Sequence, residues 1–343
     1  MSKRITRKDV AKIAGVSVSA VSRVINNNGY VAKEKKVAII NALKETGYRQ
    51  SRKAATTQEN ITKQLLFYNK DMRNEFTIEM YRGMLDYASR YDYMIVLSGT
   101  WDVKKIMTIA IDGVILPRPY NPVIDEYIAL MGSKMSLPTV CASYGNAKKR
   151  PKNIPIIDAD SYAAMEILID YLFDKGHSNI ALATPSTDAE EDPRISAYRN
   201  KLLPIFGKSI NKYIFTHCNE SNQIGFDEEN FFVYGEQIAR QMHESKCDAT
   251  AVACFNDNLA IGMINCFHKL GLRVPEDISV AGIDGLNIGN YVYPRLTSVS
   301  MSPFIQGSEC VRVLLDLIDG KKVKARTNIP LRIVEGDSVK LLK

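Results

Sequence analysis

Residues 5–26 constrain this chain more than any other segment, because they show the pattern of two short helices joined by a tight turn. Thr6 is followed three residues later by Asp9, which predicts an N-cap and a capping box for the first helix. Gly15 gives the turn its backbone freedom, and Ser17 is placed to cap the second helix. The residues predicted to face inward are Val10, Ile13 and Ala14 on the first helix and Val21, Val24 and Ile25 on the second.

The second helix presents an outward face that can enter a DNA groove, as in a helix-turn-helix. This face consists of Val18, Ser19, Ser22, Arg23 and Asn26. The alternative is a small helical bundle whose basic residues only keep it soluble. Charge favours DNA binding, since residues 1–63 carry 14 Lys and Arg against 4 Asp and Glu, whereas the whole chain has a net charge of only +7. A basic end on a mildly acidic body is typical of nucleic-acid contact confined to that end.

A third helix is predicted from Lys33 to Glu45, with Val37, Ile40 and Leu43 in helical phase and Gly47 as its stop. Residues 49–63 are polar and basic, which predicts a linker without a packed structure of its own.

Beyond the linker, short apolar runs alternate with helical patterns. The runs are QLLFYN, YMIVLS, DGVILP, PTVCAS, NIALAT, KYIFTH, ATAVACF and ISVAGI. Near-continuous apolar strands that alternate with helices predict parallel sheets covered on both faces. The runs form two groups, at about 64–158 and 161–284, so we expect an α/β core of two doubly wound subdomains. Ligands of such sheets bind beyond the carboxyl ends of the strands, here in a cleft between the subdomains.

Composition narrows the class of protein further. A chain of 343 residues with 45% hydrophobic residues can form two or three domains. It has neither a long apolar stretch nor an apolar secretory signal, so we expect a cytoplasmic protein without a membrane span. Six scattered Cys and four isolated His give no metal-ligand or disulfide pattern. Phosphate-binding glycine motifs, a nucleophile elbow and a catalytic triad spacing are also missing, so no enzyme, metal or cofactor is expected.

The string DVAKIAGVSVSAVSRVIN closely resembles the DNA-binding headpiece of the lactose-repressor (LacI/GalR) family of bacterial transcription regulators. Further resemblance lies in GYR at 47–49, IDGVIL at 111–116, DKGHSNIALA at 174–183, the segment 254–285 and PRLTSVSMS at 294–302. It implies a periplasmic-binding-protein-like core in which the chain crosses between subdomains three times. The implied domains are a headpiece at 1–48, a hinge at 49–63 and an effector-binding and dimerisation domain at 64–343, divided into a first subdomain (about 64–160 and 286–321) and a second (about 161–285 and 322–343).

The resemblance also assigns residues to DNA contact. Val18, Ser19 and Arg23 match positions that contact base edges, and Arg23 can pair bidentately with a guanine. The residues expected to bond phosphates are Thr6, Ser17, Ser22 and Asn26, and for Ser17 we expect a capping role as well. In the hinge, Arg52 and Lys53 are expected on the DNA backbone. Thr57 stands where the family has a Leu that wedges into the minor groove, and a small, polar-tipped side chain is a poor wedge.

Seven residues are expected to contact the effector: five match effector-contacting positions of the family, an aromatic at Phe231 or Phe232 is expected to close the cleft although the alignment shifts by one residue there, and Arg118, between two prolines at a strand end, is placed to reach the cleft. They are Arg194, Asn256, Asp284 and the aromatic Phe231 in the second subdomain, and Phe76, Arg118 and Asp160 in the first. Alternative roles are a turn former for Asp284, a core residue for Phe76 and a helix cap for Asn256 or Asp257, of which we expect Asp257 to be the cap. Met301 stands where some sugar-responsive members have a Gln.

The resemblance therefore implies a dimeric repressor that binds near-palindromic operator DNA and is released from sugar-utilisation genes by a small carbohydrate. One alternative is a family member that represses only when loaded with a purine or a coregulator protein. A solute-binding protein with the same core fold is a more remote alternative, because the basic head and the missing signal peptide count against it.

Overall fold

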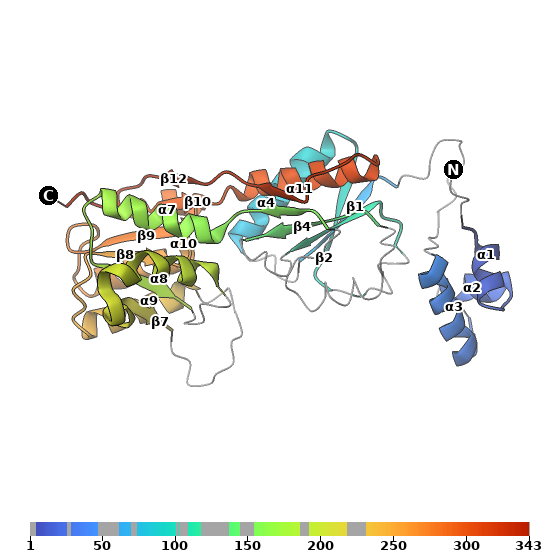
Figure 1. Ribbon diagram of the computed structural model, residues 1–343, viewed down its shortest axis with the longest axis horizontal. Helices are drawn as coiled ribbons and strands as arrows, with labels where there is room; N and C mark the ends of the chain where they lie inside the picture. Colours follow the sequence, from blue (N-terminus) through green and yellow to red (C-terminus); the bar gives the residue numbers. More distant parts are fainter. Residues whose placement is uncertain are drawn as a thin grey trace.

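The structure is a computed structural model that describes residues 5–25, 29–46, 62–69, 74–100, 102, 109–117, 137–144, 154–185, 192–217 and 231–342. A small unit of three helices lies apart from an elongated α/β core (Figure 1). The polar linker predicted between them falls almost entirely outside the described residues, so its limits at 49 and 63 stay a prediction.

The small unit consists of α1 (Arg7–Ile13), α2 (Val18–Ile25) and α3 (Lys33–Thr46). Its core contains Val10, Ala11, Val21, Ile25, Ile39 and Ala42. Two predicted inward positions were wrong, because Ile13 is 49% exposed and Val37 is 52% exposed. Apolar residues follow one another so closely in α3 that the sequence does not show which face of the helix is buried. Contact with α1 and α2 selects Ile39 and Ala42.

The first sheet of the core is parallel throughout. In spatial order its strands are β11 (Arg326–Asn328), β5 (Ile156–Asp158), β4 (Thr139–Ser143), β3 (Gly113–Pro117), β1 (Gln64–Tyr68) and β2 (Met94–Ser98). Helices α4 (Glu75–Ser89) and α11 (Pro303–Ile318) lie side by side against it. This confirms the predicted strands of the first group, while the three-residue strands β5 and β11 carry too short a pattern to be predicted.

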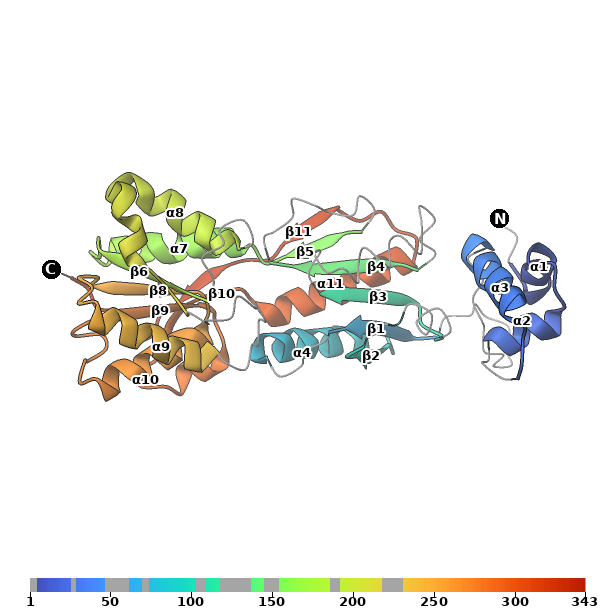
Figure 2. The same cartoon turned by 90° about the horizontal axis from the view of Figure 1, so that it is seen from below.

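The second sheet is parallel except for the edge strand β12, which is antiparallel to its neighbour β10. In spatial order its strands are β12 (Arg332–Val334), β10 (Thr297–Ser300), β9 (Ser279–Asp284), β8 (Ala251–Cys254), β6 (Ile180–Thr184) and β7 (Ile214–Thr216). Figure 2 shows α7 (Ser161–Asp174) and α8 (Pro193–Phe206) on one face, and α9 (Phe231–Glu244) and α10 (Asp257–Lys269) on the other. Short 3-10 helices follow α8 (η2, Gly207–Tyr213) and β9 (η4, Asn287–Asn290).

The chain crosses three times between the two sheets, which lie end to end in Figure 2. The crossings follow β5, β10 and β11. Two predicted boundaries were therefore misplaced. The segment after 286 still belongs to the second sheet, because β10 pairs with β9, and the chain returns to the first only after Ser300. The tail stays in the first sheet beyond 322, because β11 pairs with β5.

Helices α4 and α11 approach each other closely because glycines lie at their contact. A Cβ atom at Gly83 would lie 1.9 Å from the carbonyl oxygen of Phe304, and one at Gly307 would lie 1.8 Å from that of Met80. The Ser308 hydroxyl donates to the carbonyl oxygen of Gly83 at 3.1 Å, a bond that this short distance between the helices permits. Packing of this helix pair therefore requires two residues without side chains.

We predict that Gly307→Ala destabilises the core by about 1–3 kcal/mol or more, because the methyl group forces the helices apart. Ser89→Ala, at the exposed end of α4, is the control and should change stability by less than about 0.5 kcal/mol. Urea unfolding followed by circular dichroism measures both. A Gly307→Ala variant as stable as the control would contradict the close contact.

Candidate DNA-binding surface and effector site

The outward side of α2 is the candidate DNA-binding surface. Val18 at the start of the helix is 41% exposed, and Ser19 and Arg23 are exposed as well. The backbone N–H of Ala20 donates to Ser17 Oγ at 3.2 Å, which confirms that Ser17 caps α2. Ser17 Oγ also lies 2.9 Å from Ser19 Oγ. The cap fixes the first turn of the helix, so the side chains that would meet base edges project from a rigid end.

Helix α1 is fixed relative to α2 by polar contacts. Thr6 and Asp9 form the predicted capping box, with Asp9 N donating to Thr6 Oγ1 at 3.4 Å and Thr6 N donating to Asp9 Oδ2 at 2.7 Å. Arg7 Nη1 donates to Ser22 Oγ at 3.3 Å and so joins α1 to α2. Thr6 and Ser22 thus have structural roles, and their contacts with phosphates stay predictions.

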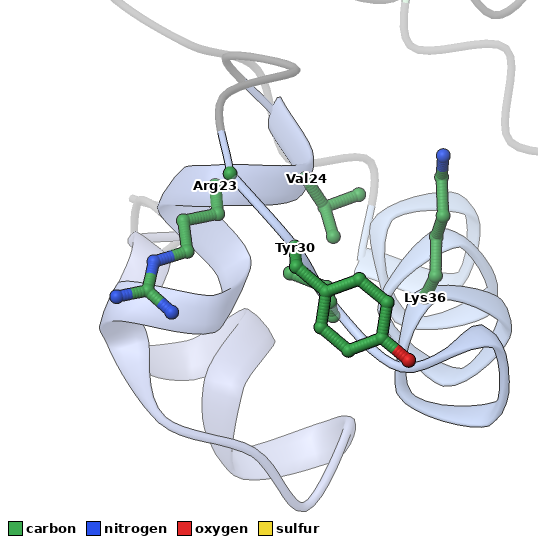
Figure 3. Close-up of a pocket in the computed structure, with 6 residues that line it drawn as sticks. Arg23, Val24, Tyr30 and Lys36 are labelled. Atoms are coloured by element: carbon green, nitrogen blue, oxygen red, sulfur yellow. The ribbon is translucent and has the colours of Figure 1, made fainter.

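The sequence analysis missed part of this surface. A pocket beside α2 is lined by Arg23, Val24, Gly29, Tyr30, Val31 and Lys36, and Figure 3 shows Tyr30 between Arg23 on α2 and Lys36 on α3. Tyr30 is 88% exposed. Gly29 has a φ of +87°, a backbone conformation that favours glycine, and places this loop against the Arg23 side chain. The glycine was the one signal for this loop in the sequence. Asn26, Arg52, Lys53 and Thr57 lie outside the described residues.

In the second subdomain, Arg194 is held in a fixed position at the start of α8. Its guanidinium donates to both carboxylate oxygens of Asp192, at 3.0 and 2.8 Å, and to the carbonyl oxygen of Phe255 at 2.9 Å. It also lies over the Phe255 ring, 3.3 Å from the centroid. Asp192 caps α8, and the DPR sequence, with Pro193 at the first helical position, was the available signal for this partner.

Phe231 and Asn256 lie beside Arg194. The Phe231 ring stacks on Phe255 with centroids 5.8 Å apart, and Phe231 is 4% exposed. Asn256 follows Phe255 and caps α10, since its Oδ1 accepts from Leu259 N at 2.9 Å. The expectation that Asp257 is the cap was therefore wrong, because Asp257 is already inside the helix. With Oδ1 accepting the capping bond, the Nδ2 group of Asn256 supplies the donor that a ligand could use.

Asp257 is a buried carboxylate that supports the neighbouring Asp284 turn. Its Oδ1 accepts from the Ser298 hydroxyl at 2.5 Å and its Oδ2 from Leu286 N at 2.7 Å. Ser298 Oγ in turn accepts from Gly285 N at 3.1 Å. Asp284 has a φ of +132°, where a side chain is strained, so the turn depends on these bonds to keep its shape. Burial raises the pKa of Asp257 to about 6, against the opposing effect of its hydrogen bonds.

Two of the three residues predicted in the first subdomain, Phe76 and Asp160, lie at the starts of helices α4 and α7. Phe76 is 5% exposed and meets the Tyr144 ring edge-to-face at 5.3 Å, so its core role is confirmed. Asp160 caps α7 and lies 3.2 Å from Arg326 Nη2. Arg326 also pairs with the buried Asp158. Arg118 lies outside the described residues.

Glu75 connects the two groups of residues. It lies at the start of α4 in the first subdomain, close enough to the backbone amides of Ile288 and Asn287 in η4, which follows the Asp284 turn, for them to lower the pKa of its carboxyl group. Desolvation raises the pKa of Glu75. The carboxyl ends of the two sheets therefore face each other with the predicted effector residues around them, and sequence patterns alone did not reveal Glu75.

Two family models match this chain. Residues 6–51 match the bacterial regulatory proteins of the lacI family, and residues 169–339 match the periplasmic binding protein-like domain. The first match covers α1, α2 and α3. The second match covers all strands of the second sheet, together with α11 and β11 of the first subdomain.

The chain belongs to the lactose-repressor family.

Two relatives similar to this chain over nearly its whole length are named as repressors. The ribose operon repressor of Halalkalibacterium halodurans is 27% identical over 98% of this chain and 97% of its own length. The HTH-type transcriptional repressor PurR of Vibrio atlanticus is 28% identical over 98% of this chain and 99% of its own length. This protein is accordingly a LacI-family transcriptional repressor and not an enzyme.

Solved structures show the same fold. A LacI family regulator from Enterococcus faecium with bound ribose has a TM-score of 0.67 at 22% identity, over 82% of this chain and all of the other. The lac repressor dimer bound to operator and the anti-inducer ONPF has a TM-score of 0.63 at 21% identity, over 98% of this chain and all of the other. Across the described ranges, no helix is both long and apolar enough to span a membrane, and no cluster of His, Cys, Asp or Glu suits a metal ion.

We predict a pH signature for Asp257 in this repressor. Its folded-state pKa of about 6 exceeds that of an exposed aspartate, so the folded protein binds the proton more tightly. The contribution of Asp257 to the free energy of unfolding therefore falls as pH rises from about 4 to about 6. Asp257→Asn removes this titration, so the variant should be more destabilised, relative to wild type, at pH 4.5 than at pH 6.5 in urea unfolding.

Asp277→Asn is the control, because the hydrogen bond from Arg273 lowers the pKa of Asp277 to about 2, below the tested range. Its difference from wild type should be the same at both pH values. A pH-independent difference for Asp257→Asn as well would contradict the raised pKa.

Proposed function

We propose that this repressor binds a near-palindromic operator as a homodimer and is released from sugar-utilisation genes by a small, neutral carbohydrate. Val18, Ser19 and Arg23 contact base edges in this proposal. Phosphates are bound by Thr6, Ser17, Ser22, Asn26, Arg52 and Lys53, with Tyr30 and Lys36 added by the pocket beside Arg23. Since it acts on DNA, its site of action is the cytoplasm.

The observation that carries the effector proposal is the group formed by Arg194, Phe255, Phe231 and Asn256. It combines aromatic rings with hydrogen-bond donors of fixed direction. Asp284 at the end of β9 in the same sheet and Asp160 after β5 in the first sheet supply acceptors. A sugar suits such a site, because it donates and accepts hydrogen bonds at several points and has an apolar face that can lie on an aromatic ring.

Charge favours a neutral sugar over a phosphorylated one. Arg194 is already paired with Asp192, and Arg326 is shared between Asp158 and Asp160. Glu75 and Asp284 add further carboxylates at the facing sheet ends. An anionic ligand would meet this excess of negative charge without an unpaired arginine among these residues. Ribose is the first candidate, because a relative is named a ribose operon repressor.

Release from DNA requires that the sugar bind one arrangement of the subdomains better than the other, since a ligand with equal affinity for both shifts nothing. Three crossing segments join the subdomains, and in this proposal the subdomains change their relative angle about them. A sugar bound between the sheet ends would thus stabilise one arrangement of the subdomains over the other.

Dimerisation is supported by exposed apolar side chains in both subdomains. Tyr291 is 80% exposed and Tyr293 is 88% exposed beside the second sheet. In the first subdomain, Ile78, Leu85, Met94 and Leu97 are exposed on α4 and β2. Apolar groups gathered on a surface favour protein contact, and paired headpieces match a two-fold symmetric operator. Analytical ultracentrifugation at micromolar concentration should give the mass of a dimer, and a monomer would contradict this part of the proposal.

The alternative is a repressor that needs a loaded corepressor, a purine or a coregulator protein. It is favoured by the similarity to PurR repressors and by Met301, which is buried and stands where some sugar-responsive members have a polar Gln. The two proposals predict opposite effects of the ligand on operator affinity, because a corepressor strengthens operator binding and an inducer weakens it.

Operator binding is tested by selecting duplexes from a random DNA pool with the purified full chain. The expected product is a two-fold symmetric site, and recovery of no preferred sequence would refute operator recognition. Arg23→Ala should then cost about 1–3 kcal/mol on this duplex and relax the preference at one base pair in each half-site. Arg240→Ala, an exposed arginine on α9, is the control and should leave binding unchanged.

The effector is tested by thermal shift with ribose, other sugars, sugar phosphates and purines. A ligand at a hundredfold excess over its Kd stabilises the folded state by about 2.7 kcal/mol. Arg194→Lys should abolish the shift, because an ammonium cannot reproduce the bidentate pair with Asp192, whereas Arg199→Lys on the same helix should keep it. A shift with purines alone would favour the corepressor alternative.

A further inference from the structure

The point where the linker enters the core is fixed by a single carboxylate. Asp112 Oδ1 accepts from Thr62 N at 2.9 Å and from Thr62 Oγ1 at 3.0 Å, and Asp112 Oδ2 accepts from Lys63 N at 2.7 Å. These two residues precede β1, whose pairing with β2 and β3 begins at Gln64 and Leu65. The carboxylate therefore holds a piece of chain whose backbone amides the sheet ladder does not bind.

Lys63 is fixed from its other side as well. Its Nζ donates to the carbonyl oxygen of Tyr91 at 3.0 Å and lies 4.5 Å from the centroid of the Tyr93 ring. Its own carbonyl oxygen accepts from Met94 N at 2.8 Å. Lys63 has a φ of +56°, which is unfavourable for a residue with a side chain. Such a conformation persists only where the surroundings hold it, and here Asp112 and the Tyr91–Met94 segment do so.

We propose that Asp112 is a positioning residue for operator binding, because its carboxylate sets the place and direction in which the linker leaves the core. The inference rests on the proposed function, since it assumes two headpieces that bind one operator. Each headpiece is joined to its core only through the linker, and half-sites lie a fixed number of helical turns apart. The second headpiece binds at an effective concentration that depends on how tightly the tether is held.

Loss of the carboxylate frees Thr62 and Lys63 to join the linker. The tether becomes longer and its direction variable, so simultaneous binding of both headpieces weakens while each headpiece still binds a half-site unaided. The same anchor passes the orientation of the first subdomain to the linker. An inducer that turns this subdomain then has less effect on the headpieces of an unanchored variant.

The test compares full-length wild type, Asp112→Ala and Asp112→Asn on the selected two-fold operator and on a duplex that carries one half-site. We expect Asp112→Ala to weaken binding to the full operator on the order of 10-fold and to leave half-site binding unchanged. Asp112→Asn keeps one acceptor oxygen and should fall between. Asp170→Asn, an exposed partner of Lys201 in the second subdomain, is the matched control and should behave as wild type.

Hydrogen exchange provides a readout that does not depend on DNA. The amides of Thr62 and Lys63 should exchange faster in Asp112→Ala than in wild type, with β1 and β3 unchanged. Asp112→Asn keeps the proposal testable if the alanine variant unfolds. If wild type prefers the full operator to the half-site and Asp112→Ala binds the full operator as tightly as wild type, the role of Asp112 is overturned and the dimeric operator proposal stands. A wild type without that preference overturns the dimeric operator proposal and this role together.

Discussion

Buried polar groups at the facing ends of the two sheets have to find partners inside the protein, and this requirement organises the core. Parallel strands end at the same edge of their sheet, so Asp158 lies at the carboxyl end of the first sheet, and Asn256 and Asp284 lie together at the carboxyl end of the second. Each engages the protein: Arg326 pairs with Asp158, Asn256 caps α10, and Asp257 holds the turn after Asp284. The protein itself thus fixes these side chains, so the proposed ligand site is organised before a ligand arrives.

The same polar contacts join parts that have to move together in a switch. Arg326 on the returning strand bonds Asp158 and Asp160, which start the first crossing, and Glu75 reaches η4 beside the Asp284 turn. In the proposed function, a ligand that enters between the sheet ends would touch groups that also join the subdomains. At the opposite end of the first sheet, Asp112 bonds the residues that continue into the linker. In the proposed mechanism, the first sheet therefore connects the effector site at one end with the start of the linker at the other.

Sequence analysis succeeded where the determining interactions are local. The capping box of Thr6 and Asp9, the cap at Ser17 and the apolar strands depend on neighbours a few residues away, and the structure confirms them. It failed in α3, where several apolar stripes were possible, and at Asn256 and Asp257, where one residue of shift decides which side chain caps the helix. It also failed for β10 and β11, because the sheet that a strand joins depends on partners distant in the sequence.

By itself, the sequence determined that this chain has a helix-turn-helix on a basic end, an α/β core and the features of the lactose-repressor family. Caps, turns, charge and hydrophobic periodicity are properties of short segments, so they can be recognised in the sequence without knowledge of the fold. Only the tertiary structure decided where the chain crosses between the sheets, and that Asp192, Asp257, Glu75 and Asp112 support the functional residues. Most of these contacts join residues far apart in the chain, and a carboxylate in the sequence does not show which distant amide or arginine it will meet.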